Sequence, residues 1–108
     1  MMNFSRISAE KAKTLLAKAD TNLIDIRDEQ SFQLGHIVAA QHIDNHCIAE
    51  FIAKADKSKP LIVCCYHGNS SQSAAQFFVE QSFQEVYSLD GGFEHWRTLY
   101  PQDCTQGQ

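Results

Sequence analysis

Leu61-Ile62-Val63-Cys64-Cys65-Tyr66-His67-Gly68-Asn69-Ser70 is the segment from which the architecture of this 108-residue chain can be predicted. Its first four residues are all apolar, which predicts a strand buried on both faces. A six-residue loop follows at once, and a helix is predicted from about Ser71 to Gln81. A buried strand, a short loop and a helix in this order are typical of the centre of a mostly parallel α/β sheet.

On both sides of this segment, short apolar runs alternate with stretches of helical period, as in α/β domains. The expected strands are Phe4 to Ile7, Asn22 to Ile26, Gln41 to Ile43 at an edge, and Glu85 to Leu89. The first expected helix is capped by Ser8 and turns Ala12 and Leu15 inward, and the second runs from Asp28 to Leu34. The third is capped by Asp44 or Asn45 and buries Phe51, and the last runs from Phe93 to Leu99. Gly35 is expected in the left-handed region at a helix end, and Gln102 to Gln108 as a polar tail that frays.

The composition of the chain limits the classes of protein to which it can belong. The length suits a single domain over residues 1–108, with 44% apolar and 20% charged residues. A formal net charge of −4 argues against partners such as nucleic acid or an anionic membrane. The longest apolar run is far too short to span a bilayer, and no signal-peptide pattern is seen at the start. We therefore expect a cytoplasmic protein.

Cysteine and histidine contents indicate free thiols and no metal or other cofactor. The cysteines are Cys47, Cys64, Cys65 and Cys104, and the adjacent pair would point to opposite faces of a strand. We expect a structural role for Cys64, a helix-surface or edge position for Cys47 and incidental exposure of Cys104. The histidines, at positions 36, 42, 46, 67 and 95, follow no zinc-binding spacing. His67 lies inside the loop, either as a cation beside Cys65 or pointing outward.

Cys65 is the candidate nucleophile because it follows the buried strand and precedes a helix. Ligands bind at this carboxyl edge of open α/β sheets. A free cysteine is mostly protonated at neutral pH, and only its thiolate is nucleophilic. Gly68 and Asn69 tolerate the backbone conformations that a loop curling around one atom requires. Backbone amides converging on the Cys65 sulfur would each add roughly 1.5–3 kcal/mol, more than the ~0.3–1 kcal/mol of a helix dipole, so the amides are expected to do most of the stabilising.

The loop also lacks a group that a cysteine phosphatase needs. Such an enzyme clamps phosphate with an arginine six positions after its nucleophile. Ser71 occupies that position here, and no arginine occurs between Cys65 and Arg97. A small neutral loop suits a compact anion such as the outer sulfur of a persulfide better than a tetrahedral oxyanion.

Asp25 and Arg27 are expected to anchor the sheet edge, and Phe93 and Trp96 to lie in the core.

Three stretches of the sequence resemble the signatures of the rhodanese family, and in particular of its single-domain thiosulfate sulfurtransferases. They are Asp25-Ile26-Arg27-Asp28 with Leu34-Gly35-His36-Ile37, Cys65-Tyr66-His67-Gly68-Asn69-Ser70-Ser71, and Asp90-Gly91-Gly92-Phe93-Glu94-His95-Trp96. The resemblance implies a single rhodanese-like domain, with a five-stranded parallel sheet flanked by helices on both faces.

The same resemblance implies a double-displacement reaction. Cys65 would take the outer sulfur of thiosulfate, or of another sulfane-sulfur donor, and pass it to cyanide or to a thiol such as dihydrolipoate or thioredoxin. The amides of Tyr66, His67, Gly68, Asn69, Ser70 and Ser71 would form the substrate-binding cradle, and the hydroxyls of Ser70 and Ser71 would add donors. Many relatives carry a basic residue at the end of this loop, and its replacement by Ser70 suggests weak thiosulfate binding.

Alternative functions remain at this stage. A persulfide relay would use the same cysteine but take sulfur from a protein donor, and the sequence does not separate the two. A cysteine phosphatase or arsenate reductase is disfavoured by the arginine-free loop. A non-catalytic rhodanese-like binding module is disfavoured because such modules usually lose the cysteine that this chain keeps at position 65.

Overall fold

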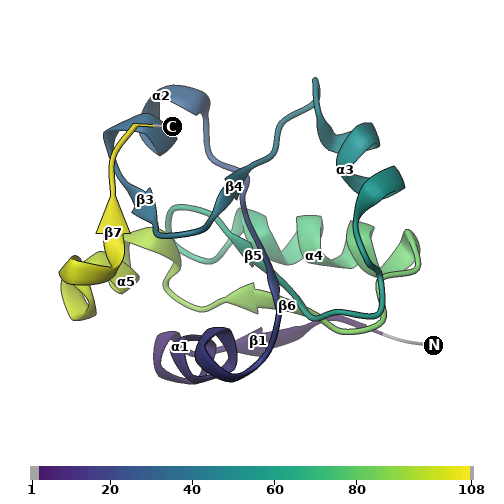
Figure 1. Ribbon diagram of the computed structural model, residues 1–108, viewed down its shortest axis with the longest axis horizontal. Coiled ribbons are helices and arrows are strands. Elements are labelled where there is room, and N and C mark those ends of the chain that lie inside the picture. Colours follow the sequence, from purple (N-terminus) through teal and green to yellow (C-terminus); the bar gives the residue numbers. More distant parts are fainter. Residues whose placement is uncertain (1–2, 108) are drawn as a thin grey trace.

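The computed structural model describes residues 3–107. Its main sheet has five strands in the order β1-β6-β5-β2-β4, and every neighbouring pair is parallel (Figure 1). The strands are β1 (Ser5–Ile7), β2 (Asn22–Asp25), β4 (Gln41–His42), β5 (Leu61–Cys64) and β6 (Val86–Leu89). The apolar run therefore forms the middle strand, β5, as predicted.

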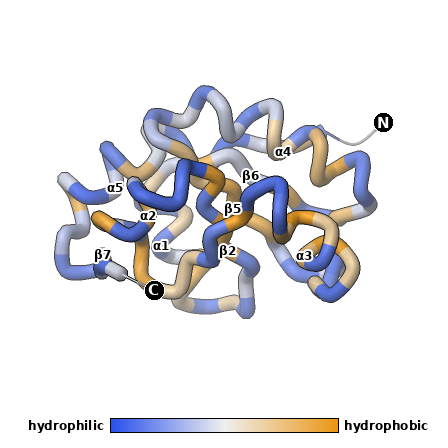
Figure 2. Tube along the Cα trace, turned by 90° about the horizontal axis from the view of Figure 1, so that it is seen from above, coloured by the Kyte–Doolittle hydropathy of each residue, from blue (hydrophilic) through white to orange (hydrophobic). Residues whose placement is uncertain are grey.

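Helices cover both faces of this sheet, which confirms the predicted class. Ile62 and Cys64 of β5 pack in one core with residues of α1 (Ala9–Lys18) and α5 (Gly92–Leu99). Leu61 and Val63 point the other way, into a core with residues of α3 (Ile48–Lys54) and α4 (Ser70–Glu80). Figure 2 shows the hydrophobic colouring of β5 inside the molecule. Because successive side chains of β5 point to opposite faces of the sheet, this one strand packs against both layers of helices.

The helix starts at Ser8 and Asp28 were predicted correctly. The Ser8 hydroxyl accepts a hydrogen bond from the Lys11 amide at 3.2 Å and caps α1. The Asp28 carboxylate accepts from the Ser31 amide at 3.0 Å and caps α2 (Glu29–Leu34). Each side chain satisfies one of the amides that a helix start leaves without a partner. As the cap of α2, Asp28 also lies beside the loop after β5, where its carboxylate contacts Tyr66.

Two local predictions were wrong. Gly35 is extended, with φ 174°, rather than left-handed, because the chain passes from α2 straight into β3 (His36–Ile37). Helix α3 begins after Cys47, without a side-chain cap, rather than at Asp44 or Asn45. The Asp44 carboxylate instead accepts from the His46 amide at 2.9 Å, within a turn that precedes the helix.

The predicted frayed tail was also wrong over the residues described. Residues 101–103 form a 3₁₀ turn, η1 (Pro101–Asp103), and β7 (Cys104–Thr105) pairs antiparallel with β3. The Gly107 amide donates to the Gln33 carbonyl at 2.8 Å. Cys104 is consequently half-buried against the core rather than incidentally exposed. Pairing with a distant two-residue strand outweighs the polar composition that suggested fraying.

Candidate active site

Cys65 lies at the carboxyl end of β5 and is enclosed by the loop that follows it. Cys65 is only 3% exposed, yet it belongs to neither hydrophobic core cluster. The sulfur accepts hydrogen bonds from the amides of Gly68 and Ser71, both at 3.2 Å. Gly68 adopts φ 90°, a conformation that side chains rarely tolerate, and this lets the loop close. Two backbone donors thus converge on one sulfur atom.

The other loop residues face outward. Tyr66, His67, Asn69 and Ser70 are exposed, so the outward alternative for His67 agrees with the structure. The resemblance suggested that the Ser71 hydroxyl would donate to the sulfur, and this was wrong. The Ser71 hydroxyl instead pairs with the Ser88 hydroxyl at 2.7 Å in the interior. That buried pair fixes the start of α4 against β6. It therefore holds the Ser71 amide, rather than its hydroxyl, toward Cys65.

The start of α5 supports the loop from a second side. The amide of Phe93 donates to the Cys65 carbonyl at 2.8 Å, and the amide of Glu94 donates to the Tyr66 carbonyl at 3.1 Å. These contacts require Gly92, because a Cβ at that position would lie 2.5 Å from the Cys65 and Tyr66 backbone. Free amides at a helix start are natural donors to such carbonyls. Sequence reasoning missed this support, although the Gly91-Gly92 pair is the signal that could have indicated it.

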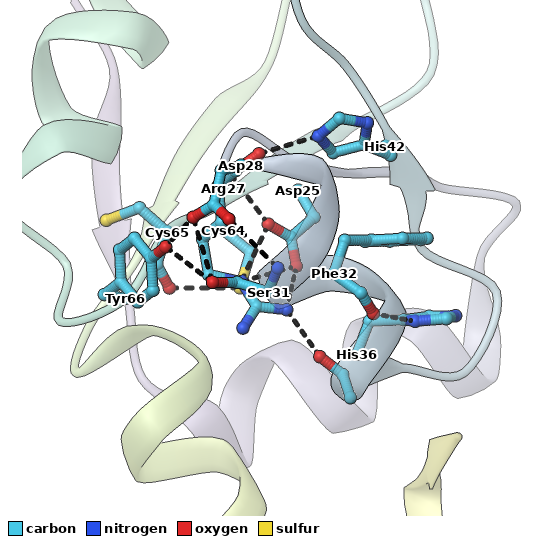
Figure 3. Close-up of polar contacts among 11 residues, drawn as sticks. Asp25, Arg27, Asp28, Ser31, Phe32, His36, His42, Cys64, Cys65 and Tyr66 are labelled. Carbon is cyan, nitrogen blue, oxygen red and sulfur yellow. Dashed lines mark hydrogen bonds and ion pairs between the residues drawn. The ribbon is translucent and has the colours of Figure 1, made fainter. Parts of the chain in front are cut away.

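A buried ion pair anchors the neighbouring strand end, as predicted. The Arg27 Nε donates to both oxygens of the Asp25 carboxylate at 3.0 Å. Its terminal nitrogen donates to Asp25 Oδ2 and to the Gly35 carbonyl, both at 2.7 Å (Figure 3). Asp25 is fully buried and Arg27 nearly so. Burial by itself lowers the pKa of Arg27, but the hydrogen bonds and charge of Asp25 outweigh it and raise that pKa. The guanidinium is therefore committed to structure.

Cys64, the thiol next in sequence, is structural as expected. It is fully buried in the core under α1 and α5. Burial raises its pKa well above the ordinary value, and the charge of Asp25 adds to that effect. Cys64 therefore stays a neutral thiol, and the two adjacent cysteines have different environments.

The Tyr66 side chain is tied to the start of α2. Its hydroxyl donates to the Asp28 carboxylate and lies 2.8 Å from the Ser31 hydroxyl, which itself donates to Asp28 at 2.9 Å (Figure 3). The bond from Tyr66, followed by those from the Ser31 amide and hydroxyl, lowers the pKa of Asp28 to about 2. Nothing in the sequence pattern indicated this cluster, because its members come from two separate segments. We call these three residues the Tyr66 tie.

The pKa of Asp28 predicts how the tie responds to acid. A folded-state pKa of about 2, below the ordinary 3.8, stabilises the fold above about pH 4, and this stabilisation is lost as the pH falls toward 2. Asp28→Asn keeps a good helix cap but removes the charge. Urea denaturation at a series of pH values should therefore show a smaller loss of stability in acid for Asp28→Asn than for the wild type. Glu29→Gln, a neighbouring exposed carboxylate, is the control, and equal acid sensitivity of all three proteins would contradict the assignment.

The histidines near the site have structural partners. His36 stacks on Phe32 at 3.7 Å between ring centroids, and its Nδ1 lies 2.7 Å from the Phe32 carbonyl oxygen. His42 Nε2 lies 2.6 Å from the Arg27 carbonyl oxygen. Within residues 3–107, no group of three or more histidine, cysteine or acidic side chains is placed to hold a metal ion. The helices described there include none with the length and apolarity that crossing a membrane would demand.

Comparison with known proteins identifies the family of this chain. A rhodanese-like domain model matches residues 8–99. Thiosulfate sulfurtransferase GlpE of Pseudomonas aeruginosa (strain LESB58) is 56% identical over 105 residues, which cover 97% of this chain and 94% of the relative. The protein of the same name from Pseudomonas savastanoi pv. phaseolicola is 56% identical over 107 residues, or 99% of this chain and all of the relative.

Solved structures share the fold at much lower identity. The Alr3790 protein from Anabaena superposes with a TM-score of 0.81 at 19% identity, over 94% of this chain and 80% of that one. A rhodanese-like domain protein from Staphylococcus aureus gives 0.75 at 18% identity, over 86% and 91%. These likenesses agree with the family match, which spans most of the sequence, and with the near full-length relatives. The chain belongs to the rhodanese family.

Proposed function

We propose that this protein is a thiosulfate sulfurtransferase that carries sulfur as a persulfide on Cys65. The observation that supports the proposal most directly is the geometry of that sulfur, which meets the Gly68 and Ser71 amides at 3.2 Å at the carboxyl edge of a parallel sheet. Relatives that are more than half identical carry the name thiosulfate sulfurtransferase. The residues that we assign to the site are Cys65 as nucleophile and the loop amides from Tyr66 to Ser71 as the cradle.

The chemistry consists of two displacements. The Cys65 thiolate attacks the outer sulfur of thiosulfate, a new sulfur–sulfur bond forms, and sulfite leaves with the electron pair of the broken bond. An acceptor, cyanide or a thiolate, then attacks the outer sulfur of the persulfide, and Cys65 leaves as a thiolate. Cyanide becomes thiocyanate, and a thiol becomes a persulfide. No net oxidation or reduction by the protein is needed.

Backbone amides supply the electrostatic stabilisation for both steps. A hydrogen bond to a charged group contributes roughly 1.5–3 kcal/mol, and two of them reach the sulfur in the resting site. The start of α4 adds about 0.3–1 kcal/mol through its dipole. These donors are held by the fold before any substrate binds, and preorganised donors of this kind stabilise developing charge best.

Enclosure of the sulfur restricts the reactants. Because Cys65 is 3% exposed, a reactant must approach through its own narrow end. The terminal sulfur of thiosulfate and the sulfur of a thiol meet this requirement, whereas a phosphate ester would bring a tetrahedral group to a loop that has Ser71 where an arginine clamp is needed. The site therefore favours sulfur transfer over phosphatase or arsenate reductase chemistry.

Mass spectrometry of the protein after incubation with thiosulfate tests the proposal. We expect one added sulfur atom, located on the peptide that contains Cys65 and removed by cyanide with release of thiocyanate. An unmodified Cys65 peptide would contradict the use of thiosulfate. Loading by a persulfidated donor protein under the same conditions would then support a persulfide relay.

The acceptor and the location are proposed on chemical grounds. All four cysteines are free, as in a reducing compartment, and we propose a cytoplasmic protein. Thiols are the abundant sulfur acceptors there, so a small dithiol or a thioredoxin-like protein is the proposed acceptor. Nucleic acid and membranes are not proposed as partners, given the net charge of −4.

A further inference from the structure

We propose that Tyr66 is a positioning residue for sulfur transfer, acting through its hydroxyl and the carboxylate of Asp28. The proposal rests on the proposed function of Cys65. It concerns the Tyr66 side chain, whose hydroxyl contacts Asp28 and Ser31 at the start of α2, and not the loop amides already assigned. Figure 3 shows the phenol ring next to Asp28 and Ser31.

The tie holds Tyr66, the second residue of the loop, whose backbone is also held by α5. The Tyr66 carbonyl accepts from the Glu94 amide at 3.1 Å. The phenol hydroxyl donates to Asp28, the cap of α2, and lies 2.8 Å from the Ser31 hydroxyl. The backbone of Tyr66 is therefore held by one helix and its side chain by another. Any rotation of this residue would displace the chain that leads from Cys65 to Gly68, whose amide must point at the sulfur.

The segment that carries Asp28 is anchored to the sheet by buried contacts. Asp28 directly follows Arg27, whose guanidinium is buried and bonded to Asp25 on β2 and to the Gly35 carbonyl. That guanidinium also lies 5.6 Å from the centre of the Tyr66 ring and 4.3 Å from that of Phe93. The loop is thereby linked to the sheet through one charged side chain between two aromatic rings. Because these contacts fix the position of Tyr66, they also affect the position of the neighbouring Cys65 sulfur.

The charge on Asp28 maintains the hydrogen bond from Tyr66 at physiological pH. The hydrogen bonds from Tyr66 and Ser31 lower the pKa of Asp28 to about 2, so its carboxylate is an acceptor at every physiological pH. A charged acceptor strengthens the bond from the phenol. The tie is partly exposed, with Tyr66 at 38%, and solvent therefore reduces its strength. Its effect is expected on rates, which respond to small displacements, more than on overall stability.

Tyr66→Phe tests the proposal because it keeps the aromatic ring and removes only the hydroxyl. We expect the rate constants of sulfur loading from thiosulfate and of discharge to cyanide, both at saturating substrate, to fall together by about tenfold. The thiosulfate concentration for half-maximal rate should not change, since the tie orients the sulfur and does not bind the anion. A raised half-saturation with an unchanged maximal rate would overturn the proposal in favour of a substrate-binding role.

Tyr87→Phe is the matched control. The Tyr87 hydroxyl donates to the Glu85 carboxylate at 2.5 Å, a bond of the same type that makes no contact with the loop. This variant should keep wild-type rates. Both variants should melt within about 4 °C of the wild type. Asp28→Asn should reproduce the rate loss, and the double variant Tyr66→Phe with Asp28→Asn should be no slower than either single variant; additive losses would overturn the coupling.

Amide hydrogen exchange separates this proposal from the proposed function. Exchange at Gly68 and Ser71 should accelerate about tenfold in Tyr66→Phe and stay unchanged in Tyr87→Phe, whether or not sulfur is transferred. Faster exchange in a protein that never loads sulfur would support the tie and refute the sulfurtransferase. Wild-type exchange and wild-type rates in Tyr66→Phe would refute the tie and leave the sulfurtransferase standing.

Discussion

Cys65→Ser is expected to abolish sulfur transfer, with a loss of at least about a thousandfold in thiocyanate formation and in sulfite release. The reaction needs a thiolate to attack sulfur and to leave again, and a hydroxyl is far less acidic and forms no persulfide. The fold should survive, because Cys65 belongs to neither core and serine retains an acceptor for the Gly68 and Ser71 amides. Circular dichroism and a urea titration check that condition.

Cys104→Ser is the matched control for this prediction. Cys104 is also a free, partly buried thiol, but burial raises its pKa and it lies on β7, far from the loop in sequence. Its replacement should leave both products forming at wild-type rates. Thiocyanate formation that survives in Cys65→Ser and disappears in Cys104→Ser would move the nucleophile to the C-terminal strand.

Gly92→Ala is expected to damage both the fold and the site. Gly92 has φ 60°, where a side chain costs roughly 1–2 kcal/mol. The added Cβ would also lie 2.5 Å from the Cys65 carbonyl oxygen and from the Tyr66 backbone, so one of the two segments must move. Together these effects should lower the free energy of unfolding by roughly 2–5 kcal/mol. Displacement of the loop should slow sulfur loading about a hundredfold in the molecules that remain folded.

Gly107→Ala separates the two causes. Gly107 also has positive φ, 83°, but a Cβ there would meet no atom within 4 Å. It should therefore show only the conformational cost, with wild-type sulfur loading. Urea titration and single-turnover loading of both variants provide the comparison. If Gly92→Ala behaved like Gly107→Ala, the close approach of α5 to the loop would not be a requirement of the site.

The parts of the fold that depend on local sequence could be predicted. Four uninterrupted apolar residues from Leu61 to Cys64 identify a strand buried on both faces, and the structure places it in the middle of the sheet. Ser8 and Asp28 act as caps through side chains three residues from their donors. In each case the decisive interaction lies within one segment, so a short window of sequence contains the information.

What could not be predicted depends on segments that meet only in three dimensions. Cys104 looked exposed because its neighbours are polar, yet β3 supplies the partner that orders it. The Ser71 hydroxyl looked available for the sulfur, but Ser88 on β6 takes it. The link between Tyr66 and Asp28 joins residues 38 positions apart. Such pairings follow from the sheet order and not from any local pattern.

The order of the strands determines how much of the chain must be synthesised before the site can form. Strand β6 lies between β1 and β5, and the next segment, α5, donates the amides that hold the Cys65 and Tyr66 carbonyls. A ribosome-bound chain that ends before Val86 already contains the cysteine and its whole loop, but lacks the partners that fold them. On the proposed function, sulfur transfer is therefore expected only once α5 has been synthesised, and a product terminated earlier would contain Cys65 without the contacts that form the site.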